Sequence, residues 1–442
     1  MNLTIKFFQN ILLKTKEVLK SAEGSLYLLA IVLSTLPLGN IYVSIATILF
    51  LVITFFSVKK SLFKIQKDFY FPIVFFLVMI MSLIWSVNIQ SSLSGLQKSL
   101  SFIVFPFAFF ALPNFNKDLL NKIFKIFSFS MSFYALFYLL NALVGFVDTH
   151  DFSLFFYNSL VPIDPGAVYM SVFASFALFY FIQLSHKSVF EIIALSILTI
   201  FLFLLSSKSI ITVDFIIIIC YYAFFAEIPS STKTLTIFMV SVFLFFSIFF
   251  VKEVKERFMI EYETAFVDNT LENSLEKANV KIHNVSIEEA WNDTKFNKTD
   301  FFPGTALRIY QIRIFKEIML ENNKFLTGFG LESSQEQIRI KSLENNLHQD
   351  YGEYNFHNQY LQTFAELGIL GLIVLVWMLF VNIINALRNK DFLHIAFAIT
   401  MIMLFLSESF FCRQRGIVFF IVLYCLFNVT TTKQINKNPL IP

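Results

Sequence analysis

The chain passes from a polar to a hydrophobic region at residues 356–368, whose sequence is FHNQYLQTFAELG. The only long polar segment, roughly 252–356, ends here, and a hydrophobic run at about 367–387 follows. His357 and Asn358 therefore lie where an aqueous domain meets a membrane. Chemistry between a lipid-anchored group and an acceptor has to occur at such a border, although a histidine simply resting at headgroup depth gives the same pattern.

The composition is that of a membrane protein. Of the 442 residues, 57% are hydrophobic and only 15% are charged, and the mean hydropathy is +0.69. Soluble domains carry about a quarter charged residues, so most of this chain is expected in lipid. The net charge of +3 is too small to indicate nucleic-acid binding. Cys220, Cys412 and Cys425 lie in or beside apolar runs without metal-ligand spacing.

Twelve membrane-spanning helices are predicted, because a hydrocarbon core of about 30 Å needs about 20 apolar residues per helix. They fall at approximately 25–37, 40–58, 69–87, 97–112, 121–146, 166–184, 188–205, 209–226, 233–251, 365–387, 392–407 and 414–430. Residues 1–24 are expected to form a cytoplasmic amphipathic segment and residues 431–442 a cytoplasmic tail. The fold class is thus all-α and integral to the membrane. Spans 1–9 occupy 25–251, a periplasmic loop domain 252–362, and spans 10–12 residues 363–430.

The orientation follows from lysine and arginine in the short loops, which mark the cytoplasmic side. Basic residues occur in every second loop, at Lys59, Lys60, Lys64, Lys67, Lys117, Lys187, Lys233, Arg388 and Lys390. The loop at 147–165 has three aspartates and no lysine or arginine. Both termini are therefore expected in the cytoplasm of the bacterial inner membrane, with the long segment in the periplasm.

Three cations break this charge rule. Lys208 falls in the hairpin between spans 7 and 8, and Arg413 and Arg415 fall between spans 11 and 12, close to Glu408. All are predicted at the periplasmic side. Ionisable residues at membrane depth are costly and tend to mark a site, with snorkelling to the outer headgroups as the alternative.

A helix is predicted at about 306–321 within the polar segment. It carries Arg308 and Arg313, and apolar residues share one side with Arg308 at the three/four spacing. Arginines on such a helix at the outer leaflet suit lipid phosphate, whereas an ordinary surface helix is the alternative. The Gly328-Phe329-Gly330 turn that follows is too weak a signal for a nucleotide loop.

No nucleotide-binding or hydrolase motif is present. His348 and His357, with Asp350 and Glu353 between them, allow a divalent cation, but their spacing is nonspecific. Fixed cations bind phosphate and stabilise a diphosphate leaving group, and a neutral histidine can take a proton from an attacking hydroxyl. Together these groups describe glycosyl transfer from a lipid diphosphate, with arginine in place of a metal and without a cofactor.

The pattern around these residues resembles the O-antigen ligase and O-antigen polymerase superfamily. It consists of Arg308 in a periplasmic helix, Gly328 and Gly330, and then His357, Asn358, Tyr360, Leu361, Glu366, Gly368, Gly371 and Leu372 leading into a membrane helix. About twelve spans with a large late periplasmic loop also match. The resemblance implies a GT-C-like fold, an undecaprenyl-diphosphate glycan as donor, and a metal-independent inverting mechanism.

The resemblance also implies roles for single residues. Arg308 matches the loop arginine that binds the donor diphosphate, and His357 matches the histidine proposed to activate the acceptor hydroxyl. Lys208 follows Leu205-Ser206-Ser207, where the family often has a Leu-Ser-x-Ser-Arg-like stretch, so it keeps the charge but loses the bidentate fork. The other candidates for contact with the diphosphate or the acceptor are Arg313, Asn358, Tyr360, Glu408, Arg413 and Arg415.

The acceptor stays open at this point. A ligase moves a finished glycan to lipid A-core, a polymerase extends the glycan on its carrier, and an O-linked protein glycosyltransferase is a third member of the class. A flippase and a chain-length regulator are the expected protein partners. A polysaccharide flippase or secondary transporter is the alternative of another class, but it predicts paired repeats and midplane charges, whereas the charges here cluster at helix ends. A structural scaffold gives no reason for Lys208, Arg413 and Arg415. We expect an enzyme, with ligase ahead of polymerase.

Overall fold

The computed structural model describes residues 22–57, 66–112, 117–163, 165–250 and 283–437, with the single residues 255, 259 and 262. Within these ranges the regular elements are helices, apart from one isolated β-bridge between Asn284 and Phe301. The amphipathic segment predicted at 1–24 lies almost entirely outside the described residues, as do Lys59, Lys60, Lys64 and most of 252–282.

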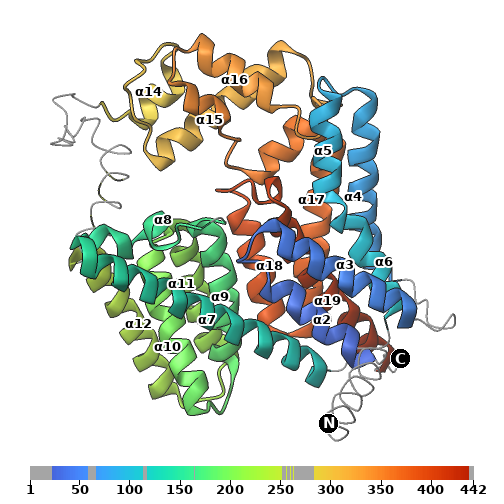
Figure 1. The fold of residues 1–442 in the computed structure, drawn as a ribbon, viewed down its shortest axis with the longest axis vertical. Coiled ribbons are helices and arrows are strands. Elements are labelled where there is room, and N and C mark those ends of the chain that lie inside the picture. Colours follow the sequence, from blue (N-terminus) through green and yellow to red (C-terminus); the bar gives the residue numbers. More distant parts are fainter. Residues whose placement is uncertain are drawn as a thin grey trace, which may run out of the picture.

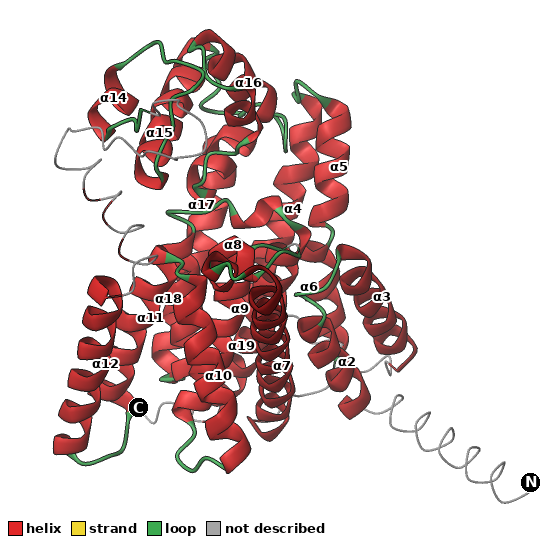
Figure 2. Cartoon of the chain, turned by 60° about the vertical axis from the view of Figure 1, so that its left-hand side comes forward, coloured by secondary structure: helices red, strands yellow, loops and turns green. Residues whose placement is uncertain are grey.

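A body of apolar helices makes up most of the molecule (Figures 1 and 2). A helix is present at each predicted span: α2 (Ala22–Ser34), α3 (Asn40–Ser57), α4 (Tyr70–Met81), α6 (Ser101–Ala111), α7 (Lys117–Thr149), α9 (Ala167–Gln183), α10 (Val189–Leu205), α11 (Lys208–Cys220), α12 (Ser230–Phe250), α17 (Gln359–Asn389), α18 (Phe392–Leu404) and α19 (Gln414–Lys437). Within the described residues, five helical stretches are long and apolar enough to cross a membrane, and further apolar helices are shorter. The multiple apolar helices indicate a membrane protein, while twelve spans, the domain boundaries and the orientation stay predictions.

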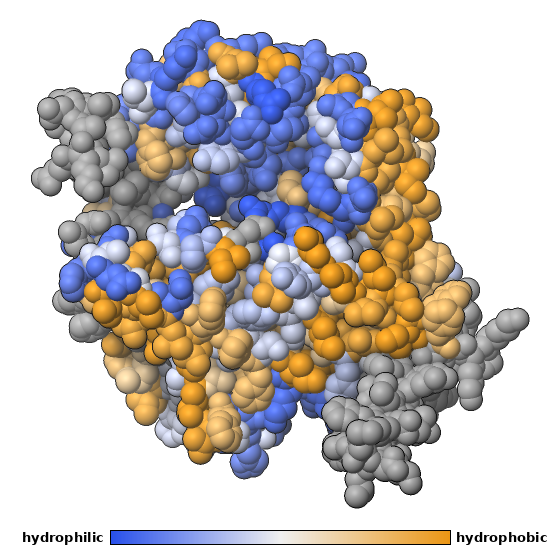
Figure 3. Space-filling model, in the orientation of Figure 1, coloured by the Kyte–Doolittle hydropathy of each residue, from blue (hydrophilic) through white to orange (hydrophobic). Residues whose placement is uncertain are grey.

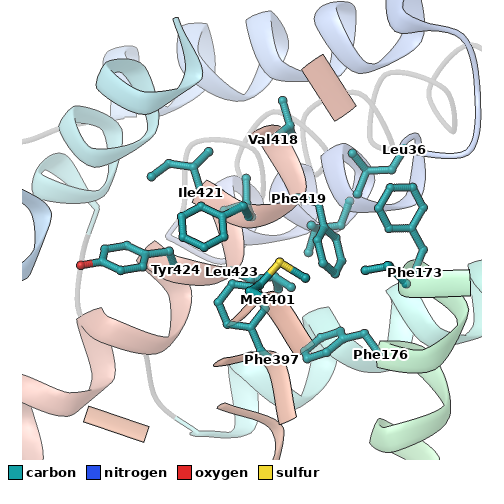
Figure 4. Packing of buried hydrophobic residues seen from close by; sticks show 14 of the residues in the cluster. Leu36, Phe173, Phe176, Phe397, Met401, Val418, Phe419, Ile421, Leu423 and Tyr424 are labelled. Atoms are coloured by element: carbon teal, nitrogen blue, oxygen red, sulfur yellow. The ribbon is translucent and has the colours of Figure 1, made fainter. Parts of the chain in front are cut away.

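Helix α19 lies at the centre of this body. From Ile417 to Phe427 no residue is more than 2% exposed, so the helix is buried on all sides. Aromatic side chains from neighbouring helices close around it, with Phe397 of α18 and Phe173 and Phe176 of α9 against Phe419 (Figure 4). A helix that is apolar all round suits such a central position.

The fourth predicted span begins earlier than the sequence suggested. Helix α5 (Ile89–Ser99) precedes α6, and together they form an apolar stretch of 23 residues, Ile89–Ala111. The apolar pattern did not predict α5, because its serines interrupt that pattern. Their partners come from a distant part of the chain: Ser92 Oγ donates to the Leu331 carbonyl at 2.6 Å, and Lys98 forms a salt bridge with Glu332.

The polar segment forms a separate layer over one end of the body. Its helices are α14 (Ile287–Asn292), α15 (Gly304–Glu321) and α16 (Gln335–Glu344), so the helix predicted at 306–321 is confirmed. This loop domain has its own core around Tyr310, Ile314 and Ile338. Its surface is largely hydrophilic, whereas apolar side chains cover the flank of the body beneath it (Figure 3).

A break in α17 fixes the loop domain to the body. Gly368 has φ 67° and ψ −167°, which interrupts the helix and leaves neighbouring backbone groups without helical partners. The amides of Phe329 and Gly330 donate to the carbonyls of Ala365 and Glu366 at 2.8 and 2.9 Å. The Ile369 amide in turn donates to the Phe325 carbonyl at 2.9 Å. The 325–331 loop therefore takes the place of helical hydrogen bonds at the break.

The same loop also contacts the hairpin between α4 and α5. Trp85 Nε1 donates to the Thr327 carbonyl at 2.6 Å, and the Val87 amide donates to the Phe329 carbonyl at 2.9 Å. One loop thus joins the loop domain, the broken helix and a second pair of body helices, and this arrangement sets where the end of α17 lies.

Replacing Gly368 with alanine should destabilise the fold. A Cβ there would lie 2.1 Å from the Leu326 carbonyl oxygen, and the positive φ adds strain. We expect Gly368→Ala to lower the unfolding free energy by roughly 2 kcal/mol or more, measured by thermal unfolding in detergent. Gly39→Ala is the matched control, because a Cβ at Gly39 meets only ordinary contacts at 3.7 Å and beyond. Equal melting of both variants would show that the break does not hold the domain.

Candidate functional site

A cavity of about 710 Å³ lies between the loop domain and the end of the helical body that faces it. The body contributes a turn-rich segment around Tyr157 and Gly166, together with Glu408 and Arg413. The loop domain contributes the start of α15, including Arg308, and the residues leading up to His357. Figure 3 shows the hollow between the two layers. Four of the candidates predicted from the sequence therefore line one space.

A second cavity of about 260 Å³ adjoins the first. The residues that line both are Tyr157, Val168, Gly304, Arg308 and Glu408. The second cavity adds Lys208 with its neighbours Ser207 and Ser209. Lys208 lies at the first residue of α11. Arg308 and Glu408 thus line both spaces, and a fifth candidate lies within the same region.

Arg308 links the two layers. Its Nη1 donates to the Gly304 carbonyl at 3.0 Å within α15. Its Nε donates to the Ser407 carbonyl at 3.2 Å, which joins the loop domain to the helical body. Ser407 directly precedes Glu408. Two carbonyl acceptors hold the guanidinium in one orientation, so its charge is fixed at the edge of both cavities.

His357 and Glu408 form a pair in the large cavity. His357 has φ 46°, and its amide donates to Asn355 Oδ1 at 2.8 Å, which turns the chain just before α17 begins. His357 Nδ1 lies 3.8 Å from Glu408 Oε2. The other ring nitrogen, Nε2, is buried and has no hydrogen-bond partner within the described residues. A proton on Nδ1 facing the carboxylate would leave Nε2 as a proton acceptor.

Arg413 belongs to the part of the large cavity's lining that the helical body contributes. Its guanidinium stacks over the ring of Tyr169 at 5.4 Å, and its Nη1 lies 3.4 Å from the carbonyl of Pro165. Tyr169 is itself held, because its ring stacks on Phe410 and its hydroxyl donates to the Phe410 carbonyl at 3.1 Å. Arg308 and Arg413 thus present one guanidinium from each layer, and the same lining also holds two carboxylates, Glu353 and Glu408.

Arg313 lies elsewhere, in the core of the loop domain. It is only 6% exposed, its guanidinium is 5.1 Å from the centre of the Tyr310 ring, and its Nη1 donates to the Asp293 carbonyl. Burial raises the pKa of Tyr310 to about 12, so Arg313 lies against a neutral phenol. These contacts give Arg313 a packing role, and it lines neither cavity.

Three further candidates also lie outside both cavities. Asn358 caps α17, because its Oδ1 accepts from the Leu361 amide at 3.0 Å. The Tyr360 hydroxyl donates to the Ile402 carbonyl at 3.0 Å, which ties α17 to α18. Arg415 is 2% exposed, and its Nε donates to Asn40 Oδ1 at 3.0 Å. Their contacts place helices around the cavity without reaching it.

The sequence did not single out the 157–169 wall. Tyr157, Asn158 and Gly166 line the large cavity, and Asn158 Oδ1 accepts from the Ala167 amide at 3.1 Å. The segment has no lysine or arginine, so in the sequence it contributed only to the predicted orientation of the chain in the membrane. Its cluster of turn residues and aromatics is the feature that could have indicated a binding wall.

Glu353, Tyr354 and Asn355 form the wall next to His357. Arg339 holds Glu353 through hydrogen bonds of 2.9 to 3.1 Å, and Gln335 Nε2 donates to the Gly352 carbonyl at 2.7 Å. In the part of the chain that the structure describes, no three His, Cys, Asp or Glu side chains gather as a metal site.

An all-helical membrane protein with a polar domain over a cavity lined by charged side chains is the class that this fold and site define. Residues 192–376 match the family model described as O-antigen ligase. This match confirms the resemblance found in the sequence over these residues. The family transfers lipid-linked glycans at membranes. The match includes Lys208, Arg308 and His357. A search of curated proteins found no match to this chain.

The two arginines of α15 should separate stability from binding. Arg313→Ala removes a buried guanidinium and its partners, so we expect it to lower the unfolding free energy by roughly 2 kcal/mol. Arg308→Ala should change it by less than about 1 kcal/mol, since Arg308 is only partly buried. Thermal unfolding and limited proteolysis of the purified protein measure both. An Arg313→Ala protein with wild-type melting would contradict the packing role.

Proposed function

We propose that this chain is an O-antigen ligase-like glycosyltransferase of the GT-C type in the bacterial inner membrane. It moves a glycan from an undecaprenyl-diphosphate donor to lipid A-core on the periplasmic face. The observation that carries the proposal is that Arg308, His357, Glu408 and Arg413 line a single cavity, with Lys208 in the space beside it. These groups come from four separate stretches of the chain, so their meeting is not a consequence of sequence proximity.

The cations are assigned to the donor. Arg308 lines both cavities, Lys208 lines the smaller one and Arg413 the larger one, so a diphosphate at their junction would meet all three charges. In the reaction, the bond between the anomeric carbon and the diphosphate oxygen breaks, and negative charge grows on that oxygen. Fixed cations stabilise this charge most in the transition state, which lowers the barrier without a metal.

The histidine is assigned to the acceptor. The acceptor hydroxyl oxygen attacks the anomeric carbon from the face opposite the leaving diphosphate, so the configuration inverts. The hydroxyl proton passes to His357 Nε2, the ring nitrogen for which the described residues offer no hydrogen-bond partner. Glu408, 3.8 Å from Nδ1, then stabilises the imidazolium. The carboxylate is thus a positioning group for the base.

The acceptor decides between ligase and polymerase. Both would use the same donor and the same cations, so only the walls that meet the acceptor differ. Here those walls carry Tyr157, Asn158, Tyr354 and Asn355, and aromatic and amide groups suit sugar rings in either case. The polymerase is the alternative, a protein O-glycosyltransferase is a rarer one, and a flippase with a chain-length regulator would supply and limit the donor.

Replacing His357 should slow turnover more than it weakens donor binding. We expect His357→Gln to lower kcat by about 10²–10⁴, and Glu408→Gln to lower it less while shifting the pH profile. Arg308→Ala should raise KM for the donor and lower kcat, because both ground state and transition state carry the diphosphate. The assay is transfer from a purified lipid-linked glycan. Lys316→Gln, on the exposed side of α15, is the matched charge control. A defect of His357→Gln confined to donor binding would remove it as the base.

Chelation tests the cation-only chemistry. Because arginine and lysine supply the positive charge in this proposal, EDTA should leave the transfer rate unchanged. The measurement is the initial rate before and after dialysis against chelator, with Mg²⁺ or Mn²⁺ added back. A loss that the metal restores would overturn the metal-independent mechanism.

Deletion of the gene distinguishes the acceptors. We expect the deletion strain to lose all long glycan on lipid A-core and to accumulate polymer on the carrier lipid, as seen by gel analysis of surface glycans. Complementation with the wild-type gene should restore the pattern and His357→Gln should not. Lipid A-core bearing a single repeat unit would instead indicate a polymerase.

A further inference from the structure

A third cavity lies at the far end of α17 from the reaction site. Its volume is about 530 Å³, and it is formed by η1 (Lys67–Phe69), the start of α4 and the last turns of α17. Twenty residues separate the break at Gly368 from Arg388 in its lining. At a rise of 1.5 Å per residue this is roughly 30 Å, the thickness of a hydrocarbon core. A membrane helix of this length reaches from one headgroup layer to the other, which favours the headgroup level of the opposite leaflet for this cavity.

Its rim is cationic. Lys67 and Arg388 line it and are exposed, and neither side chain forms a salt bridge or hydrogen bond with another described residue. The single acidic side chain of the lining, Asp68, accepts a hydrogen bond from Asn385 Nδ2 at 3.1 Å and interacts electrostatically with Arg388. Two cations against one carboxylate leave the cavity with net positive charge.

Its floor is apolar. Phe71, Phe380, Val381 and Ile384 line it, and Phe380 is 51% exposed on the flank of α17. A site with two cations at headgroup level and an apolar trough running into the bilayer matches one ligand class in both halves. Basic pockets between membrane helices are suited to anionic lipid headgroups.

We propose that this cavity binds an anionic glycerophospholipid. The phosphate lies between Lys67 and Arg388, and an acyl chain lies along Phe380, Val381 and Ile384. A lipid with an ethanolamine headgroup carries its own ammonium, which the two cations disfavour, so the site selects for net negative charge. The proposal concerns lipid binding alone and does not depend on the reaction assigned to the other cavity.

Native mass spectrometry of the purified chain tests the site. The probes are phosphatidylglycerol and phosphatidylethanolamine with identical acyl chains. We expect the wild type to retain phosphatidylglycerol preferentially and Lys67→Gln/Arg388→Gln to lose about tenfold in its affinity. Lys122→Gln/Lys390→Gln is the matched control, since it removes two exposed cations outside this lining. Equal losses in both double variants would overturn the site, because they would indicate attraction by bulk charge only.

A separate variant tests the apolar part of the cavity. Val381→Trp fills the trough and leaves both cations in place, so it should also weaken phosphatidylglycerol binding severalfold. Inorganic phosphate and glycerol phosphate distinguish a lipid from a free anion. Competition by either one at the concentration of the lipid, or undiminished lipid binding by Val381→Trp, would show that no acyl chain is held and would refute the lipid proposal. Equal retention of phosphatidylethanolamine would refute the charge selection.

Discussion

The architecture depends on a helix that is broken where it leaves the loop domain. At Gly368 the backbone of α17 turns to φ 67°, and the 325–331 loop supplies the hydrogen bonds that the helix gives up. Unpaired backbone groups near lipid cost several kcal/mol each, so the loop cannot be withdrawn without a large penalty. Gly328 is needed on the other side of the contact, because a Cβ there would lie 2.6 Å from the Glu366 carbonyl. Two glycines 40 residues apart thus form one joint.

This joint determines where the candidate site lies. The residue that begins the approach to α17 is His357, and α15, which bears Arg308, ends just before the loop that fills the break. Both are therefore tied to the same anchor, while Glu408 and Arg413 come from the connection between α18 and α19 in the body. The Arg308 contact with the Ser407 carbonyl joins the two sides directly. A cavity formed between two layers needs such fixed points, because a transition-state contact is lost with a shift of about 1 Å.

Three cations broke the loop-charge rule, and two of them, Lys208 and Arg413, line the cavities. The third, Arg415, is buried and bonded to Asn40 outside both cavities, so the rule alone did not separate site residues from packing residues. Arg313 lies five positions after Arg308, so the helix turns it toward the core of the loop domain. Its partners there are Tyr310 and Asp293. The sequence pattern cannot show these contacts, because they depend on how the domain folds. The polar face of α5 was missed because its partner, Leu331, lies more than 200 residues away. The 157–169 wall was missed because turn and aromatic residues carry no charge that marks a site.

The cavities at the two ends of α17 both contain cations but differ in their acid–base groups. Each carries cations in its lining, and each is proposed to bind a phosphate. The loop-domain end adds His357 with Glu408 beside it, and among the described residues no group bonds the His357 Nε2, so this nitrogen is the proposed proton acceptor. The opposite end has Asp68 and Asn385 already bonded to each other, and no histidine in its lining. It can therefore hold an anionic group but has no base in place to activate a hydroxyl. In these two proposals the difference between binding and transfer lies in the pair of His357 and Glu408, since cations occur in both linings.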